Sequence, residues 1–177
     1  MRRQKGFSLI ELLIVVAIIL IIAAIAIPNL LRARISANEA SAASSIRTTN
    51  SGQVSYISAY PATGYAGNMG ALGPPAITGC PGTGPVAANA CLIDFVLASA
   101  TAPGTPKSGY YFGIGAVAVG GVNLSYTVGG AASTFNQSGV RGFCSLADGV
   151  IRADPNHNAA PTTVAGTCSA APYAALQ

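Results

Sequence analysis

The sequence has few charged residues. Asp, Glu, Lys and Arg make up 8% of its 177 positions, against roughly 25% in an average soluble domain. A surface so poor in charge is suited to packing against copies of itself. The length allows one domain of ordinary size together with a membrane segment.

The sequence also lacks the residues of an active site. It has one histidine, His157, and no Gly-Lys-Ser/Thr motif of a phosphate-binding loop. Neither a nucleophile–base–acid group nor a nucleotide site can be assembled from the other residues. We therefore predict a protein that is not an enzyme and needs no cofactor.

The four cysteines lack the paired C-x-x-C spacing that is typical of a zinc site. They are Cys80, Cys91, Cys144 and Cys168. Because all four follow the apolar N-terminal segment, two disulfides formed outside the cytoplasm are the better interpretation. Three pairings are open. Sequential pairing, Cys80 with Cys91 and Cys144 with Cys168, closes the shortest loops, and each bond would contribute roughly 3 kcal/mol by chain entropy.

An excess of basic residues gives the chain a net charge of +4, which alone would suggest nucleic acid or an anionic membrane as a partner. Three of the nine basic residues, Arg2, Arg3 and Lys5, precede the apolar segment, which leaves six against five acidic residues. Arg141 and Arg152, on neighbouring predicted strands, are weak evidence for a nucleic-acid face, since a solvated sheet edge explains them equally well. Nucleic acid is therefore only a secondary candidate partner.

Asp154, Asn156 and Asn158 have the D-x-N-x-N spacing with which an EF-hand-like calcium loop begins. The rest of such a loop is missing, because Ala159 stands where glycine is expected and Ala165 where the bidentate acid is expected. A polar turn is the favoured interpretation, and we predict no other metal site.

One long apolar segment dominates the N-terminal part of the chain. Residues 7–27 would form a helix of about 31 Å at ~1.5 Å per residue, which matches the roughly 30 Å hydrocarbon core of a bilayer. The basic residues before it favour a cytoplasmic N-terminus. A cleavable secretory signal with an A-x-A-like site at residues 24–26 is the alternative, but such signals have only about 7–15 apolar residues and no acid.

Glu11 is the acidic residue of this segment. An unpaired charge in hydrocarbon costs about 2.5 kcal/mol or more. The carboxylate therefore has two ways to avoid that cost: it reaches the cytoplasmic headgroups, or it pairs with a cation.

Beyond the segment, apolar residues recur at helical spacing after Pro28, which predicts an amphipathic continuation of the helix to about residue 57. Proline lacks an N–H and clashes with the preceding turn. We therefore expect a kink or a local opening of the helix at Pro28.

The residues GFSLIE, from Gly6 to Glu11, and the apolar run to Pro28 resemble the class III signal of the type IV pilin family. The resemblance covers residues 1 to about 60. It implies that a prepilin peptidase cleaves between Gly6 and Phe7 and methylates the new N-terminal amine of Phe7. It also implies that Glu11 pairs with the Phe7 amine of a neighbouring subunit during assembly, and that the helix before Pro28 can open in the filament.

The same resemblance implies a structural subunit of a type IV pilus. Such a subunit is inserted once in the inner membrane, is recognised by the prepilin peptidase and the pilus assembly platform, and polymerises with identical or related pilin subunits into an extracellular filament. Whether the filament serves twitching motility, adhesion, DNA uptake or secretion is left open. The alternatives are a pseudopilin of a type II secretion system, a minor pilin and, from another class, a tip adhesin or DNA-binding pilin.

The remainder of the chain predicts an α+β fold. Proline and glycine interrupt residues 59–107, so we predict loops and one short helix there, capped by Asn89 and burying Leu92, Phe95 and Val96. Residues 108–177 predict a hairpin with a Gly-Gly turn and a second pair of strands joined by an Asp-Gly turn. Four antiparallel strands would pack on the amphipathic part of the helix.

The tail after these strands contains Cys168, which can tie it to Cys144. This staple resembles the C-terminal disulfide loop of type IV pilins. The predicted organisation is thus a leader, a membrane-spanning and filament-core helix, its amphipathic continuation, a loop region with a short helix, and an antiparallel sheet with a disulfide-tied C-terminal loop. Their ranges are 1–6, 7–28, 29–58, 59–107 and 108–177.

Overall fold

A computed structural model of the chain describes residues 8–176. The chain consists of two compact units, residues 1–34 and residues 35–177, here called the N-terminal and the C-terminal unit. Gly6 and Phe7, the predicted cleavage and methylation site, lie outside the described residues.

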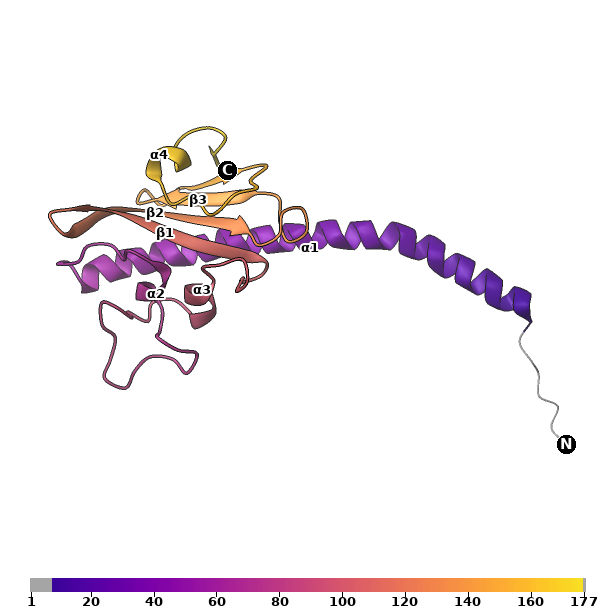
Figure 1. Ribbon diagram of the computed structural model, residues 1–177, viewed down its shortest axis with the longest axis horizontal. Helices are drawn as coiled ribbons and strands as arrows, with labels where there is room; N and C mark the ends of the chain where they lie inside the picture. The colour runs from indigo at the N-terminus through magenta and orange to yellow at the C-terminus, as the bar shows by residue number, and fades with distance from the viewer. Residues whose placement is uncertain (1–7, 177) are drawn as a thin grey trace. The chain divides into compact units, whose positions relative to one another are not determined.

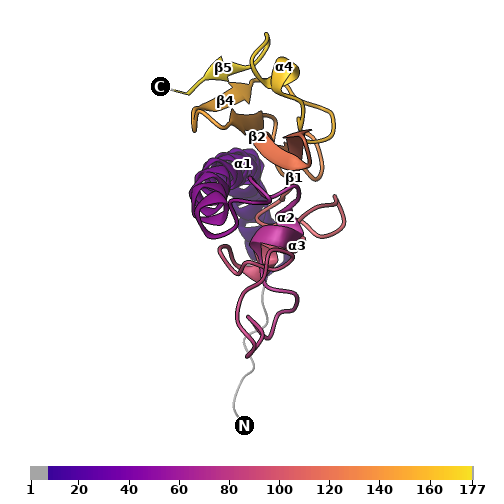
Figure 2. The same cartoon turned by 90° about the vertical axis from the view of Figure 1, so that its left-hand side faces the viewer.

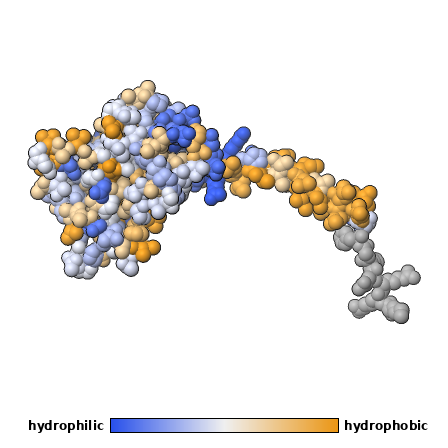
Figure 3. Space-filling view, viewed as in Figure 1, coloured by the Kyte–Doolittle hydropathy of each residue, from blue (hydrophilic) through white to orange (hydrophobic). Residues whose placement is uncertain are grey.

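The N-terminal unit contains the first part of helix α1 (Leu9–Ala59). Its Leu, Ile and Val side chains between residues 9 and 27 are 46–78% exposed, and Figure 3 shows them as a hydrophobic surface. Among the described residues, α1 is the one helix long and apolar enough to cross a membrane, and its most apolar 18-residue stretch has no buried residue. A helix that is apolar on every side needs lipid or other helices to cover it.

Helix α1 continues through Pro28 without a break in its helical conformation. Because the proline has no N–H, the carbonyl of Ala24 lacks its usual helical donor. The local opening expected at Pro28 is absent from this conformation of the chain, and opening during assembly remains a prediction.

The C-terminal unit contains a five-stranded antiparallel sheet in the order β1-β2-β3-β4-β5. Figures 1 and 2 show the later part of α1 along one face of the sheet and helix α4 on the opposite side. Its strands are β1 (Tyr110–Val119), β2 (Val122–Ala132), β3 (Gly142–Leu146), β4 (Ile151–Asp154) and β5 (Ala174–Ala175). Its short helices are α2 (Met69–Leu72), α3 (Phe95–Ser99) and α4 (Ala165–Cys168).

The α+β class and the antiparallel sheet are confirmed, but the sheet has one strand more than the four predicted. The added strand, β5, pairs Ala174 with Ala153 and Ala175 with Arg152 on β4. A strand of two residues has no alternating pattern that a sequence could reveal. It forms because the tail is already held beside the sheet.

Both predicted turns are present. Val119 of β1 pairs with Val122 of β2 across Gly120 and Gly121, whose φ angles of 60° and 85° are those of a two-residue hairpin turn that favours glycine. In the second turn, Gly149 has φ 72° and its N–H donates to the Leu146 carbonyl at 3.0 Å.

The predicted start of the short helix was wrong. Helix α3 begins after Asp94, not Asn89, and the Asp94 carboxylate accepts the Leu97 N–H at 2.9 Å. Cys91 has a left-handed φ of 57°, which no α-helix accommodates, so a helix starting at Asn89 is excluded. Two of the side chains predicted to be buried are instead exposed: Leu92 and Val96.

Helix α1 contributes to the core of the C-terminal unit one face that carries both polar and apolar side chains. Side chains three or four residues apart on this face are at most 2% exposed: Ala42, Ile46, Thr49, Gln53 and Tyr56. Burial of Gln53 is tolerated because its amide donates to the Ala66 carbonyl at 3.0 Å and accepts the Ala66 N–H at 2.8 Å. This reciprocal pair fixes the loop after α1 against the helix.

Glu39 joins α1 to the segment before β3. Its Oε1 accepts the N–H groups of Val140 and Arg141, both at 3.0 Å, and its Oε2 accepts Nε of Arg141 at 2.7 Å. Burial of Glu39 favours the neutral acid, but these donors and the guanidinium charge outweigh it, so the pKa of Glu39 is lowered. The carboxylate is therefore charged and fully bonded at neutral pH.

We predict that Glu39→Gln lowers the free energy of unfolding by about 1.5–3 kcal/mol at pH 7, the range for hydrogen bonds to a charged group. A lowered pKa means that this stabilisation is fully present above the unfolded value of about 4.3 and is lost as the pH falls through the lower folded value. Urea denaturation of the chain in detergent, at pH 7 and at pH 3, measures the loss of stability and its dependence on pH.

The control is Lys107→Gln, which breaks the exposed ion pair of Lys107 with Asp94 and should change stability by about 0.5 kcal/mol or less. An equal loss for Glu39→Gln at both pH values would show that the charge of Glu39 is irrelevant.

Candidate functional site

Glu11 lies in the first turn of α1 and caps the helix of its own chain. The Ser8 N–H donates to Oε2 of Glu11 at 2.9 Å, and Ser8 directly precedes the first helical residue, Leu9. Ser-x-x-Glu is the sequence of a capping box, and the carboxylate also lies at the positive end of the helix dipole. The Ser-x-x-Glu spacing is a local signal in the sequence, but Glu11 was interpreted there only as a charge in an apolar segment.

The other acidic side chains contact a basic side chain within the C-terminal unit. The pairs are Glu39 with Arg141, Asp94 with Lys107, Asp148 with Arg152, and Asp154 with His157. Of the five acidic residues of the chain, Glu11 alone has no basic partner within the described residues.

Arg141 and Arg152, the two candidates for contacts with nucleic acid, are engaged within the fold. Nε of Arg141 is bonded to Glu39 and its guanidinium lies 5.5 Å from the centre of the Phe143 ring. Arg152 is paired with Asp148, and this pair lowers the pKa of Asp148. Each of the two guanidinium charges thus already has an acidic partner within the fold.

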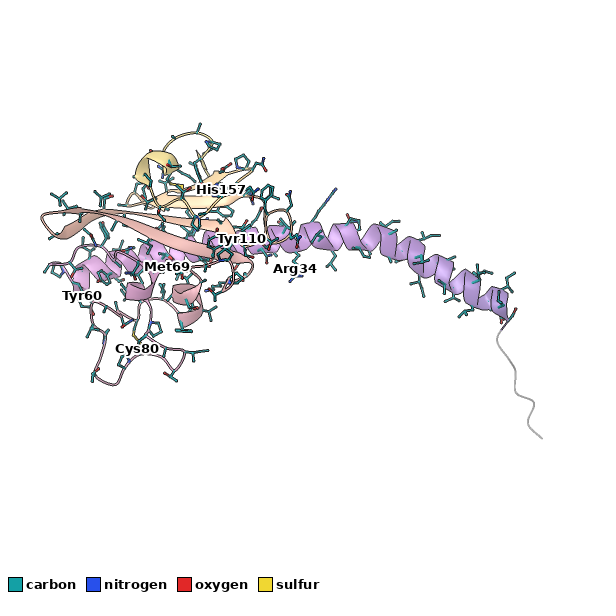
Figure 4. All side chains as sticks on the ribbon, viewed as in Figure 1. Arg34, Tyr60, Met69, Cys80, Tyr110 and His157 are labelled. Carbon is teal, nitrogen blue, oxygen red and sulfur yellow. A yellow bond between two sulfur atoms is a disulfide. The ribbon has the colours of Figure 1, made fainter. Side chains whose placement is uncertain are left out.

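Both disulfides have the sequential pairing. Cys80 is bonded to Cys91 and Cys144 to Cys168, and Cys80 is labelled in Figure 4. The first bond closes the loop of residues 80–91, which carries the exposed Val86. The second joins β3 to α4, and both of its cysteines are completely buried, so the C-terminal loop is anchored in the core.

The C-terminal loop, residues 155–173, crosses the sheet over a row of glycines. A Cβ atom on Gly115 would collide with the carbonyl oxygen of Thr163, and one on Gly129 with the backbone of Thr162. The absence of side chains at these two positions allows the loop backbone to touch the sheet. The Thr162 hydroxyl, in turn, is 2.7 Å from the hydroxyl of Tyr173.

His157 fastens the start of the same loop (Figure 4). Its Nδ1 lies 3.1 Å from Oδ2 of Asp154 and 3.2 Å from the Tyr173 hydroxyl, and its Nε2 lies 3.0 Å from the Ala160 carbonyl. Every one of these contacts is within the loop or to the end of β4. The histidine is therefore a structural residue, with neither ring nitrogen directed at an open site.

The candidate calcium ligands lie in a polar turn. Oδ1 of Asp154 accepts the Asn156 N–H at 3.0 Å and Oδ2 contacts His157, so both carboxylate oxygens are used. The side chains of Asn156 and Asn158 are exposed. Across the described part of the chain, no group of three or more His, Cys, Asp or Glu side chains could hold a metal ion.

Comparison with known proteins identifies the N-terminal segment. Residues 1–27 match the family described as the prokaryotic N-terminal methylation motif. The type IV wide pilus major component PilA4 of Thermus thermophilus is 69% identical over 39 residues, which are 22% of this chain and 30% of that protein. The type IV major pilin protein PilA of Myxococcus xanthus is 45% identical over 56 residues, 32% of this chain and 26% of that protein.

The N-terminal part of the chain therefore carries a prokaryotic methylation motif, and the two relatives that are similar to it there are type IV pilins. The similarity spans less than a third of the length of each relative. No solved structure matches the chain.

We predict that Gly129→Ala displaces the C-terminal loop, because its new methyl group would occupy the position of the Thr162 backbone. The free energy of unfolding should fall by about 1–3 kcal/mol, as for other overpacked sites, and amide hydrogens of residues 155–173 should exchange faster. Gly166→Ala is the control, since its methyl group would meet no atom within 4 Å. Unchanged exchange in Gly129→Ala would contradict the close contact.

Proposed function

We propose that the protein is a structural subunit of a type IV pilus. It is inserted in the inner membrane with a cytoplasmic N-terminus, cleaved by the prepilin peptidase between Gly6 and Phe7, methylated at Phe7 and polymerised through α1. The observation that carries this proposal is the first part of α1, whose most apolar 18-residue stretch has no buried residue and which begins within a methylation motif.

The apolar surface of α1 needs a cover at each stage of this path. Lipid covers residues 9–27 before assembly, and the same residues of neighbouring subunits cover them in the filament. The hydrophobic side chains thus serve first as an anchor and then as an interface. The partners are identical or related pilin subunits, the prepilin peptidase and the assembly platform.

Glu11 selects and registers the incoming subunit. Cleavage creates a cationic amine on Phe7, and a charge in an apolar environment is costly until it is paired. Since the other acids are engaged within the C-terminal unit, Glu11 is the acid that an amine from a neighbouring subunit can reach. Because the unpaired charges are costly, a subunit whose position pairs its charge with that of its neighbour is favoured over one added in another register.

The C-terminal unit forms the outer surface of the filament. Its two disulfides suit a compartment outside the cytoplasm, and the loop anchored by Cys144 and Cys168 resembles that of pilus subunits more than that of the major pseudopilins. We propose no catalytic activity, because polymerisation is the function.

Mass spectrometry of filaments sheared from cells, compared with the membrane fraction, tests the proposal. A dominant filament species that starts at methylated Phe7, lighter by two hydrogens for each disulfide, is the expected result. Processed chain confined to the membrane fraction would favour a pseudopilin or minor pilin. A chain that begins after Ala26 would refute the assignment.

Replacement of Glu11 separates its two contacts. We predict that Glu11→Ala and Glu11→Gln leave cleavage intact but reduce the yield of sheared filaments by at least about tenfold, because the Phe7 amine loses its counter-charge. Gln keeps an acceptor for the Ser8 N–H, as in a capping box. Normal filaments from Glu11→Gln, with few from Glu11→Ala, would mean that the helix cap and not the charge is what assembly requires.

A further inference from the structure

Three arginines of α1 have no acidic partner within residues 8–176: Arg32, Arg34 and Arg47. All three side chains are exposed. The remaining basic residues of this range, Lys107, Arg141 and Arg152, are each in an ion pair. A second copy of the chain offers no spare acid, since its Glu11 is assigned to the Phe7 amine. Under the proposed function, an anion that pairs with the three arginines would come from outside this protein.

Two of these arginines directly follow the apolar segment. Arg32 and Arg34 stand five and seven residues beyond Ile27, a rise of about 7 and about 10 Å along the helix. The headgroup layer of a bilayer is roughly 5–8 Å deep on each side of the hydrocarbon core, and an arginine can bend its long side chain back toward it. Both guanidinium groups can therefore reach the depth of the lipid phosphates.

Their spacing lets them reach separate lipids. Residues two positions apart in an α-helix differ by about 200° around its axis. Arg32 and Arg34 therefore project from opposite sides of α1 (Arg34 is labelled in Figure 4). Arg47 is 13 residues beyond Arg34, about 20 Å further along the helix, and belongs to the C-terminal unit. It lies beyond the reach of headgroups that contact Arg34.

We propose that Arg32 and Arg34 bind the phosphate groups of phospholipids in the leaflet at the C-terminal end of the membrane span. The inference rests on the membrane stage of the proposed function. Phosphate is the anion present at this depth on every side of the helix, and the planar guanidinium binds it with two parallel hydrogen bonds. These contacts set the depth of the subunit in the membrane and have to break when it is extracted into a filament.

The contact also accounts for two positive charges on the translocated side. The positive-inside rule disfavours arginines there, because they oppose the orientation set by the basic leader. Attraction to lipid phosphate offsets this effect once the segment is inserted. A polyanion such as nucleic acid lying along α1 would instead use Arg47 together with the other two.

Solid-state NMR of the chain that begins at Phe7 tests this proposal, because it lacks the two arginines of the leader. The chain is labelled with ¹³C at the arginine guanidinium carbon and reconstituted in bilayers of phosphatidylethanolamine and phosphatidylglycerol, and the dephasing of the arginine signal by lipid ³¹P is measured. We expect Arg32→Gln/Arg34→Gln to lower the dephased arginine signal per chain at least about twofold. Arg47→Gln, which removes an exposed arginine from the same helix, should leave that signal per chain unchanged.

Resistance to alkaline carbonate extraction reports membrane insertion separately. Inserted protein with the same dephased signal per chain in Arg32→Gln/Arg34→Gln as in the wild type would overturn this inference and leave the proposed function standing. An equal fall in Arg47→Gln would also overturn it, since the contact would then follow charge along the whole helix. Extraction of the wild-type chain by carbonate would overturn the membrane stage of the proposed function and this inference with it.

Discussion

The first part of α1 presents apolar side chains on every side, and this constraint governs the rest of the molecule. None of the residues in its most apolar stretch is buried, so the cover has to come from outside the chain. Lipid tails and neighbouring apolar helices can both cover this surface, because both are apolar. The proposed passage from membrane to filament would therefore replace one apolar cover by another.

The C-terminal unit satisfies its polar groups internally. Among the described residues, no buried side-chain nitrogen or oxygen lacks a hydrogen-bond partner. Glu39 and Gln53 show how this is done on α1 itself, where each buried polar group meets two backbone groups of another segment. The charges that remain without a partner lie on α1, at Glu11 and at the arginines after the apolar segment, where other molecules are proposed to supply one.

Several features followed from local patterns in the sequence. The apolar run, the hairpin with its Gly-Gly turn and the Asp-Gly turn were predicted because each depends on residues close together in the chain. The start of α3 was missed, because the left-handed backbone at Cys91 excludes a helix that the cap signal of Asn89 favoured. The capping box of Ser8 and Glu11 was overlooked although its signal is local.

The sequence by itself determined that this chain has a membrane-length apolar helix with a processing motif before it, because length, hydrophobicity and motif are read residue by residue. Only the tertiary structure decided which charged side chains are paired with one another. Glu39 meets Arg141 across 102 positions, and Gly129 is needed because Thr162 crosses above it. Such contacts depend on how distant segments pack, and neither composition nor spacing encodes that packing in a form that can be read from one sequence.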